Sequence, residues 1–563
     1  MKTLKKLFKK HGIHGYIIPK NDEYFNEYVG SSSDRLKFIS NFSGSAGFAL
    51  ILENKNYLFV DGRYTIQARY QSGNKFKIIT IPNKFPKDVL KFKKKIVIGF
   101  DPKLHTEKQL NIMFKIKNIS LKSINSNLID SIWSNKPKEK LRPFFLLSQK
   151  NTGASSSKKL KQVKDVLLKN KTDYLLVTAP ENVAWILNIR GHDSLYSPIP
   201  NARLLVSKKG LSYLFTNPKK TKKIKSIAAC IYDEKKIEII LNRISKKNIW
   251  LDTASCPFFY KNLLERKNKI IDKLDPIYFL KSIKNKTEIK NMKKSHLTDG
   301  VALTKFLFWL KKNFKKKKIT EISAQKKLEY FRKINPSYKF PSFNTISGTG
   351  PNSAIIHYKA STKTNRKLKR GELYLVDSGG QYSFGTTDVT RTVSLENKSK
   401  YIKEIYTRVL KGHIAVSNFK IKKNSTGSQI DQNARKFLKK IKLDYPHGTG
   451  HGVGYFLNVH EGPQSLSRNN KVFLKDGMIL SNEPGYYKEG SFGIRIENLI
   501  YIKNNKFEEL TIAPIEKDLI DKKILNKDEI KWINSYHKKV KENLFEFMNE
   551  DEKIDLTKAC SPI

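Results

Sequence analysis

Residues 374–391 read Tyr-Leu-Val-Asp-Ser-Gly-Gly-Gln-Tyr-Ser-Phe-Gly-Thr-Thr-Asp-Val-Thr-Arg, and the interpretation of the whole chain starts from them. An apolar run, a glycine-marked turn and a threonine-rich alternation predict a β-hairpin. With a turn centred on Tyr382 and Ser383, Asp377 and Asp388 lie directly opposite each other, with Cβ atoms about 5 Å apart. Two carboxylates at that distance repel, so we expect a metal ion between them. The alternative is a pair of aspartates that cap turns.

A glycine-rich block with two histidines follows downstream. It reads His447-Gly-Thr-Gly-His451-Gly-Val-Gly, and five of the eleven histidines lie between residues 357 and 460. Glycines between histidines let the backbone approach closely and aim imidazoles that a bulkier loop would obstruct. Taken alone, His451 could also be an ordinary loop histidine.

Two acidic motifs come next in the chain. They read Ser481-Asn-Glu483-Pro-Gly-Tyr and Gly493-Ile-Arg495-Ile-Glu497-Asn. On an extended strand Arg495 and Glu497 share a face. An arginine two residues from a ligand carboxylate can orient that carboxylate and damp the repulsion among its neighbours.

Four carboxylates and one imidazole make up the candidate metal ligands, which are Asp377, Asp388, His451, Glu483 and Glu497. This hard, oxygen-rich set suits Mn²⁺ or a similar divalent ion better than a structural Zn²⁺. Four anionic groups overload one ion but balance two. Paired metals about 3.5 Å apart can share a hydroxide and polarise a carbonyl, so the set predicts a hydrolase.

Length and composition indicate a multidomain globular protein. The chain has 563 residues, of which 39% are hydrophobic and 11% aromatic. Its three cysteines, Cys230, Cys256 and Cys560, have no regular spacing, which argues against a disulfide scaffold and fits a reducing compartment. The basic N-terminus lacks an apolar segment of signal-peptide length, and no run approaches a membrane span. We therefore expect a cytoplasmic protein without a membrane partner.

The formal charge of +58 is the most unusual number in the composition. It could indicate a protein that binds nucleic acid or another polyanion. However, the lysines are spread along the chain without the interleaved aromatic residues of a base-stacking surface. The abundance of Lys, Asn and Ile instead indicates the codon usage of the host. We expect no specific nucleic-acid partner, only weak and salt-dependent attraction to polyanions.

Repeated markers divide the N-terminal half into two similar domains, at residues 1–150 and 151–282. Tyr16-Ile-Ile in the first corresponds to Tyr174-Leu-Leu in the second, and Tyr57-Leu-Phe-Val corresponds to Tyr213-Leu-Phe-Thr. Short apolar strands also resemble each other by chance, so the markers are a moderate signal. Two copies predict a duplicated domain rather than a solenoid.

The third domain is expected over residues 283–563, again with an internal repeat. Apolar periodicity predicts helices over 287–314 and 320–334, followed by the aspartate hairpin. Helices around 401–418 and 427–440 then precede a second strand pair at 478–483 and 492–502, and a terminal helix begins near Lys527. The order helix, helix, hairpin thus occurs twice.

Several separated motifs together resemble one known family. They are the hairpin, His-Gly-Thr-Gly-His-Gly-Val-Gly, Asn-Glu-Pro-Gly-Tyr-Tyr, Gly-Ile-Arg-Ile-Glu-Asn, Ile355-Ile-His-Tyr, Val459-His-Glu-Gly-Pro and Asp61-Gly-Arg-Tyr. The chain resembles the pita-bread metallopeptidases, and within them the long, three-domain cytosolic Xaa-Pro aminopeptidases (aminopeptidase P). The resemblance implies an α/β (α+β) fold with two creatinase-type domains followed by a pita-bread catalytic domain.

The resemblance also implies roles for individual residues. The five candidate ligands match those of a dinuclear site that usually holds manganese, with Asp388 and Glu497 as the bridging carboxylates. Glu483 matches the residue that shuttles a proton. Three histidines match those around the scissile bond, namely His357, His447 and His460, of which His357 and His460 also bind substrate. Arg63 matches a first-domain arginine that binds the peptide.

The activity implied is removal of the first residue from peptides with proline in the second position, by a metal-bridging hydroxide that attacks the scissile carbonyl. Members of the family form homodimers. Three alternatives remain: a prolidase that cuts only Xaa-Pro dipeptides, a metal-free creatinase-like enzyme, and a non-catalytic pita-bread protein that binds nucleic acid or other polyanions. The complete set of five ligands disfavours the last two.

Overall fold

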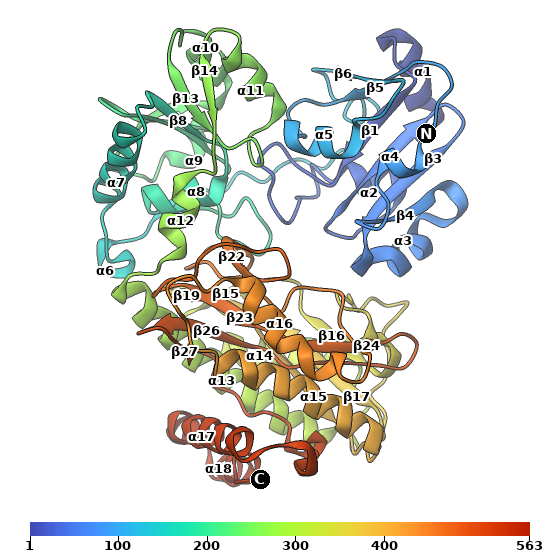
Figure 1. Ribbon diagram of the computed structural model, residues 1–563, viewed down its shortest axis with the longest axis vertical. Helices are drawn as coiled ribbons and strands as arrows, with labels where there is room; N and C mark the ends of the chain where they lie inside the picture. The colour runs from blue at the N-terminus through green and yellow to red at the C-terminus, as the bar shows by residue number, and fades with distance from the viewer. The chain divides into compact units, whose positions relative to one another are not determined.

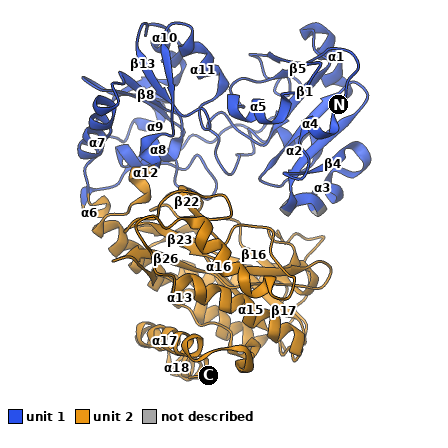
Figure 2. Ribbon diagram, viewed as in Figure 1, with its two compact units in different colours: residues 1–149, 154–278 blue, residues 150–153, 279–563 orange. Residues whose placement is uncertain are grey.

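The computed structural model describes residues 1–563, except for the side chains of Arg63 and Ile66. The chain divides into two units (Figure 2): residues 1–149 with 154–278, and residues 150–153 with 279–563. The first unit contains the two N-terminal sheets, and the second contains the candidate ligands (Figure 1). The predicted mixed α/β architecture is confirmed.

The first unit has two six-stranded sheets with the same plan. In chain order the strands of the first sheet are β1 (Gly15–Pro19), β2 (Gly47–Leu52), β3 (Asn56–Asp61), β4 (Lys77–Ile81), β5 (Ile96–Phe100) and β6 (Ile119–Ser123), arranged as β4-β3-β2-β1-β5-β6. Those of the second are β8 (Tyr174–Val177), β10 (Arg203–Ser207), β11 (Tyr213–Thr216), β12 (Cys230–Asp233), β13 (Asn248–Leu251) and β14 (Lys269–Asp272), arranged as β12-β11-β10-β8-β13-β14. The two sheets also share their pattern of parallel and antiparallel pairs. The marker strands β1 and β8 therefore hold equivalent positions.

Both faces of the first sheet are covered, which explains why its strands read as continuous apolar runs. Along β1, Tyr16 and Ile18 belong to one core cluster and Ile17 to another, because successive side chains point to opposite faces. The longer helices of this unit are α1 (Lys2–His11), α2 (Arg35–Ser40), α3 (Thr65–Ser72), α5 (Glu107–Phe114), α7 (Ser156–Lys169), α8 (Pro180–Leu187), α10 (Ile237–Asn242) and α11 (Phe258–Glu265).

In the second unit the predicted helices are confirmed to within a few residues. They are α13 (Lys286–Asn313), α14 (Glu321–Lys333), α15 (Lys400–Ser417) and α16 (Gly427–Lys439). Asn285 and Thr320 begin the first two with capping boxes, each accepting a hydrogen bond from the first turn. The terminal helix is divided into α17 (Lys527–Leu544) and α18 (Glu550–Ala559), separated by a short 3₁₀ turn that contains Phe545.

The strands of the second unit form four sheets, and α13 and α14 pack on the sheet of the aspartate hairpin. The strands are β15 (Tyr338–Pro341), β16 (Ile346–Thr349), β17 (Leu373–Ser378), β18 (Gly380–Tyr382), β19 (Gly385–Thr386), β20 (Val389–Ser394), β21 (Gly450–Gly452), β22 (Glu461–Leu466), β23 (Ile479–Asn482), β24 (Gly485–Lys488), β25 (Phe492–Arg495), β26 (Asn498–Lys503) and β27 (Lys506–Glu509). Helices α15 and α16 pack with β23 and β26 in a second core cluster.

The register of the aspartate hairpin differs from the predicted one. Asp377 lies opposite Thr390, not opposite Asp388. The turn lies between Tyr382 and Gly385, one residue later than predicted, and this shifts every cross-strand partner by two residues. Asp388 therefore lies diagonally from Asp377 on the same face, where side chains still come within reach of one another.

The predicted strand over residues 492–502 is two strands in different sheets. β25 pairs with β24, whereas β26 pairs with β23 and β27. The break falls at Ile496 and Glu497, where the backbone N–H of Glu497 donates to the carbonyl of Thr390, 3.2 Å away. The chain thus changes sheets at a candidate ligand.

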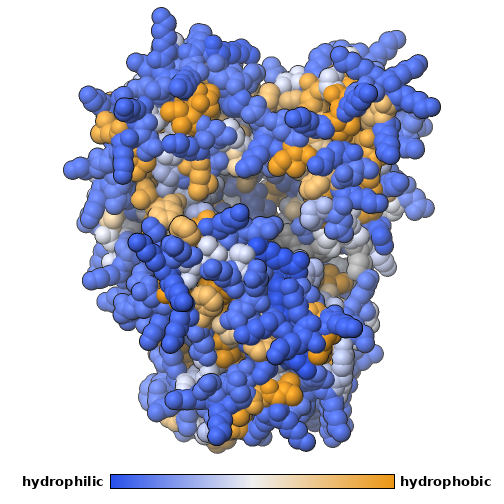
Figure 3. All heavy atoms as spheres, in the orientation of Figure 1, coloured by the Kyte–Doolittle hydropathy of each residue, from blue (hydrophilic) through white to orange (hydrophobic). Residues whose placement is uncertain are grey.

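Hydrophilic side chains cover most of the face seen in Figure 3, as the large excess of lysine requires. Among the described residues, no helix has the length and apolar character needed to cross a membrane. The three cysteines are unpaired.

Candidate metal centre

The five candidate ligands lie in or beside strands that meet in the second unit. Asp377 is in β17 and Asp388 directly precedes β20, so the hairpin carries both. His451 is the middle residue of β21, and Glu483 follows the last residue of β23. Glu497 occupies the break between β25 and β26.

His451 is the point at which the hairpin and the later strands converge. Its Nε2 lies 3.4 Å from Oδ2 of Asp388 and 3.5 Å from Oε1 of Glu483. One ligand atom each from Asp388, His451 and Glu497 lie within 4.8 Å of one another. The Nδ1 of His451 lies 2.9 Å from the carbonyl of Gly452, which can only accept, so Nδ1 carries a hydrogen and Nε2 faces the carboxylates.

The donor set fits a hard divalent cation. Oδ1 of Asp377 and Oδ1 of Asp388 are both buried and have no hydrogen-bond partner in the described structure. A buried acceptor without a partner is costly, and more so when it is charged. A cation held by these oxygens would remove that cost, and carboxylate oxygens with one imidazole are ligands that Mn²⁺ prefers.

Crowding of buried acids shifts the protonation equilibria of the site. Burial raises the pKa of Asp388 to about 7, with Asp377 and Glu483 contributing in the same direction against the effect of His451. Burial, followed by the charges of Asp388 and Glu483, raises the pKa of Glu497 well above its usual value. Burial lowers the pKa of His451, but Asp388 and Glu483 outweigh that effect and raise it to about 9.

Arg495 contacts a candidate ligand directly, but that ligand is Asp377 and not Glu497, the one that its sequence position had suggested. Its guanidinium donates to Oδ2 of Asp377 over 2.5 Å. Its Nε also donates to the hydroxyl of Thr390, and that hydroxyl donates to Oε2 of Glu497 over 2.7 Å. Arg495 thus orients two of the carboxylates, one directly and one through Thr390.

Sequence reasoning missed the part played by Arg391. This arginine is buried, and it donates to the backbone carbonyls of Thr390 and Glu497 and to the hydroxyl of Tyr536 on α17. It therefore ties the hairpin to the strand break that carries Glu497. The available signal was an arginine in the predicted hairpin strand, three residues after Asp388; a charged side chain that is buried needs several partners.

The three predicted histidines lie in different surroundings. The ring of His460 is exposed, and its centroid lies 4.3 Å from that of His451. His447 lies 2.9 Å from the hydroxyl of Tyr487 through its Nε2. His357 is half-buried in the turn after the 3₁₀ helix Gly350–Ala354, whose Ser353 accepts a hydrogen bond from Gly493 of β25. The side chain of Arg63 lies outside the described residues, so its role stays a prediction.

Family comparisons divide the chain into four matched segments. Residues 290–504 match the model of metallopeptidase family M24, and residues 504–563 match the C-terminal region of that peptidase. Residues 1–130 and 135–288 each match a creatinase/prolidase N-terminal domain. Xaa-Pro aminopeptidase 1 of Dictyostelium discoideum is 36% identical over 99% of this chain and 95% of its own length. The chain belongs to metallopeptidase family M24.

Two other relatives of this M24 protein match over the full length, and a prolidase matches over part of it. Aminopeptidase P1 of Lotus japonicus is 32% identical and covers all of the chain. The crystal structure of X-prolyl aminopeptidase from Caenorhabditis elegans, described as a cytosolic enzyme with a di-nuclear active site, has a TM-score of 0.92 at 31% identity and covers 100% of the chain. The prolidase of Pyrococcus horikoshii covers 64%, with a TM-score of 0.54 at 26% identity.

Proposed function

We propose that this protein is a metal-dependent aminopeptidase that releases the first residue from peptides with proline in the second position. The observation that carries the proposal is the convergence of Asp388, His451 and Glu497 within 4.8 Å, in a chain similar over its whole length to Xaa-Pro aminopeptidases. An enzyme of this kind accounts for the two buried carboxylate oxygens that otherwise lack partners, Oδ1 of Asp377 and Oδ1 of Asp388.

Two divalent ions, with manganese as the expected metal, would be held by Asp377, Asp388, His451, Glu483 and Glu497. When bound, such a pair supplies a nucleophile from water at neutral pH and polarises the scissile carbonyl. Arg495 holds Asp377 in place, and Thr390 holds Glu497, so that neither carboxylate has to reorganise.

Glu483 is the proposed carrier of the proton. Its Oε1 accepts a hydrogen bond from Ser481 over 3.0 Å, which fixes one oxygen and leaves the other to exchange a proton. The departing group is the nitrogen of proline, which must gain a proton to leave as an amine. We expect exposed His460, whose ring lies next to that of His451, to donate to the substrate oxygen on which charge develops. His357 and His447 are the other proposed substrate contacts. Arg63 is proposed to bind the peptide.

Peptides of this kind require a specialised enzyme. Proline lacks a backbone N–H and has a fixed φ, so proteases that bind their substrate as a strand lose a hydrogen bond at that position. The alternative activity is that of a prolidase. The prolidase of P. horikoshii corresponds to 64% of this chain, whereas the X-prolyl aminopeptidase of C. elegans corresponds to all of it, which favours the aminopeptidase.

The proposed protein is a cytoplasmic homodimer. The three unpaired cysteines and the relative described as cytosolic support a cytoplasmic protein. The proposed assembly is a homodimer, which sedimentation of the purified protein would measure. Neither a specific nucleic-acid partner nor a membrane is part of the proposal.

The test is hydrolysis of X-Pro-Y, X-Pro and X-Ala-Y peptides by metal-stripped protein, before and after Mn²⁺ is added. The expected result is release of the first residue from X-Pro-Y only, and only with metal. Cleavage confined to X-Pro would identify a prolidase. No cleavage of any peptide, with no metal bound, would leave a binding protein.

A further inference from the structure

Residues 440–449 join α16 to β21, and the loop of residues 444–449 within this connection carries His447 and Gly448. It contains neither helix nor strand. Glycine adds conformational freedom that a loop must lose when it folds. Interactions from outside the loop therefore have to fix its shape.

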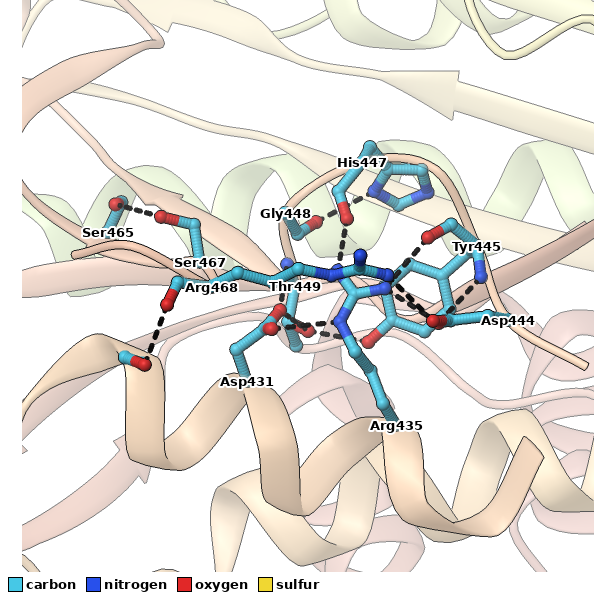
Figure 4. Close-up of polar contacts among 11 residues, drawn as sticks. Asp431, Arg435, Asp444, Tyr445, His447, Gly448, Thr449, Ser465, Ser467 and Arg468 are labelled. Atoms are coloured by element: carbon cyan, nitrogen blue, oxygen red, sulfur yellow. Dashed lines mark hydrogen bonds and ion pairs between the residues drawn. The ribbon is translucent and has the colours of Figure 1, made fainter. Parts of the chain in front are cut away.

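Two charged residues of α16 lie against this loop (Figure 4). Asp431 and Arg435 are one turn apart, and their side chains are 0% and 2% exposed, so they lie on the buried face of the helix. The Nε of Arg435 donates to Oδ2 of Asp431 over 2.8 Å. The helix itself is closely seated, because a Cβ at Gly427 would meet the carbonyl of Ser465 at 1.7 Å. The pair is thus fixed relative to the strands.

The two terminal nitrogens of Arg435 donate to loop residues 444, 445 and 447. One terminal nitrogen donates to Oδ1 of Asp444 and to the carbonyl of Tyr445, both over 2.7 Å. The other donates to the carbonyl of His447. The guanidinium also lies over the ring of Tyr445, 4.0 Å from its centroid. A planar fork reaches all of these groups at once, which a lysine cannot do.

Asp431 holds the second half of the loop. Its Oδ1 accepts from the backbone N–H of Thr449 over 3.2 Å and from the hydroxyl of Thr449 over 2.7 Å. That hydroxyl has no second hydrogen, so Tyr445 donates to it over 2.5 Å. The pair on α16 therefore fixes the loop on both sides of His447.

The ring of His447 is fixed in turn. Its Nδ1 lies 2.7 Å from the carbonyl of Gly448, so Nδ1 carries a hydrogen, and Nε2 can accept from the hydroxyl of Tyr487. Burial raises the pKa of Tyr487 to about 12, so this hydroxyl keeps its proton. The tautomer of His447 depends on the carbonyl of Gly448. Gly448 lies between His447, which Arg435 contacts, and Thr449, which Asp431 contacts.

We propose that Arg435, together with Asp431, is a positioning residue for the peptidase reaction that acts through His447. Among the described residues, the contacts of Arg435 are with Asp431 and the loop rather than with the five candidate ligands. Loss of the Arg435 guanidinium would let the loop move and change the orientation of the His447 ring, without removing a metal ligand. The inference rests on the proposed function, because it requires that His447 acts in the peptidase reaction.

The test compares Arg435→Lys, which keeps the charge and loses the fork, with Arg468→Ala. Arg468 is exposed and contacts Oδ2 of Asp444, the outer oxygen of that carboxylate. Hydrogen exchange is followed by mass spectrometry over residues 444–449, next to metal content and kcat/KM on X-Pro-Y. For Arg435→Lys we expect faster exchange confined to the loop, two metals per chain and a fall in kcat/KM of about 10–100-fold. Arg468→Ala should leave all three values unchanged.

A double-mutant cycle separates positioning from general destabilisation. In a His447→Ala background, Arg435→Lys should cause no further loss of kcat/KM, because the residue through which it acts is gone. Losses that multiply would overturn the inference, as would wild-type exchange and activity in Arg435→Lys. If Arg435→Lys does not fold, Thr449→Val removes two of the loop bonds and should loosen the same loop. An inactive wild-type protein would refute the proposed function instead. Hydrogen exchange in residues 444–449 would still test whether Arg435 and Asp431 hold the loop.

Discussion

Metal binding to the metal-free protein should release protons, and the structure gives their approximate number. The pKa of Asp388 is raised by burial to about 7, that of Glu497 is raised well above its usual value, and that of His451 is raised by its carboxylate neighbours to about 9. At pH 7 His451 therefore holds its proton and Asp388 is about half protonated, and the raised pKa of Glu497 acts in the same direction. Ligands must lose these protons to bind metal, so we expect release of at least about 1.5 protons per chain.

The sign of the pH dependence follows. Release of about 1.5 to two protons makes the apparent constant for filling the site rise about 30- to 100-fold per pH unit. In the metal-free protein the raised pKa of His451 adds stability below its unfolded value of about 6.5, which is lost as pH rises through 9. The raised pKa of Asp388 reduces stability as pH rises from about 4 through 7, and the raised pKa of Glu497 acts in the same direction. The Tm gap between metal-loaded and metal-free protein should therefore widen with pH.

The assay is calorimetric titration of Mn²⁺ into metal-stripped protein at pH 7, in two buffers of different ionisation enthalpy. The dependence of the observed heat on the buffer gives the number of protons released. His451→Gln should lower that number by about one, whereas Asp444→Asn, which changes a carboxyl outside the site, should not. Release of less than one proton by the wild-type protein, or an equal release by His451→Gln, would refute the reasoning.

Three further outcomes are expected. Asp388→Ala should abolish metal uptake and peptide hydrolysis, and full activity in that variant would rule out the site. Glu461→Gln removes the carboxylate shared by buried Lys281 and Lys284. It should lower the unfolding free energy of the second unit by about 3–5 kcal/mol, measured with guanidinium; a change below about 1 kcal/mol would mean that the lysines are neutral. Arg391→Lys cannot reach Thr390, Glu497 and Tyr536 together, so it should weaken metal affinity about 10–100-fold, measured by metal titration.

The sequence predicts which helices and strands form more reliably than it predicts how the strands pair. Helices such as α13 and α14 were predictable because their apolar periodicity extends over many turns and their caps are local. The hairpin was predicted as an element, but its register depended on which residues form the turn. Glycines at 379, 380 and 385 allow more than one turn, so the pairing of Asp377 with Thr390 could be settled only by the rest of the sheet.

The same distinction applies to the site. The motif residues could be collected from the sequence because each lies in a run with unusual glycine or acid content. The pair on α16 was missed because Asp431 and Arg435 read as an ordinary salt bridge between residues four apart on a helix. The signal against that interpretation was their place beside Ile430, Ala434 and Leu438, on the face of the helix that is buried.

The contact between Arg391 and Tyr536 has a consequence for synthesis of the protein. Every candidate ligand has been translated once residue 497 leaves the ribosome. However, the arginine that ties the hairpin to Glu497 still lacks the hydroxyl of Tyr536 and the carbonyls of Ala513 and Pro514, which it contacts in the finished structure. The nascent chain must therefore be extended through Tyr536 on α17 before this arginine has all of its hydrogen-bond partners, and metal loading is expected to be post-translational.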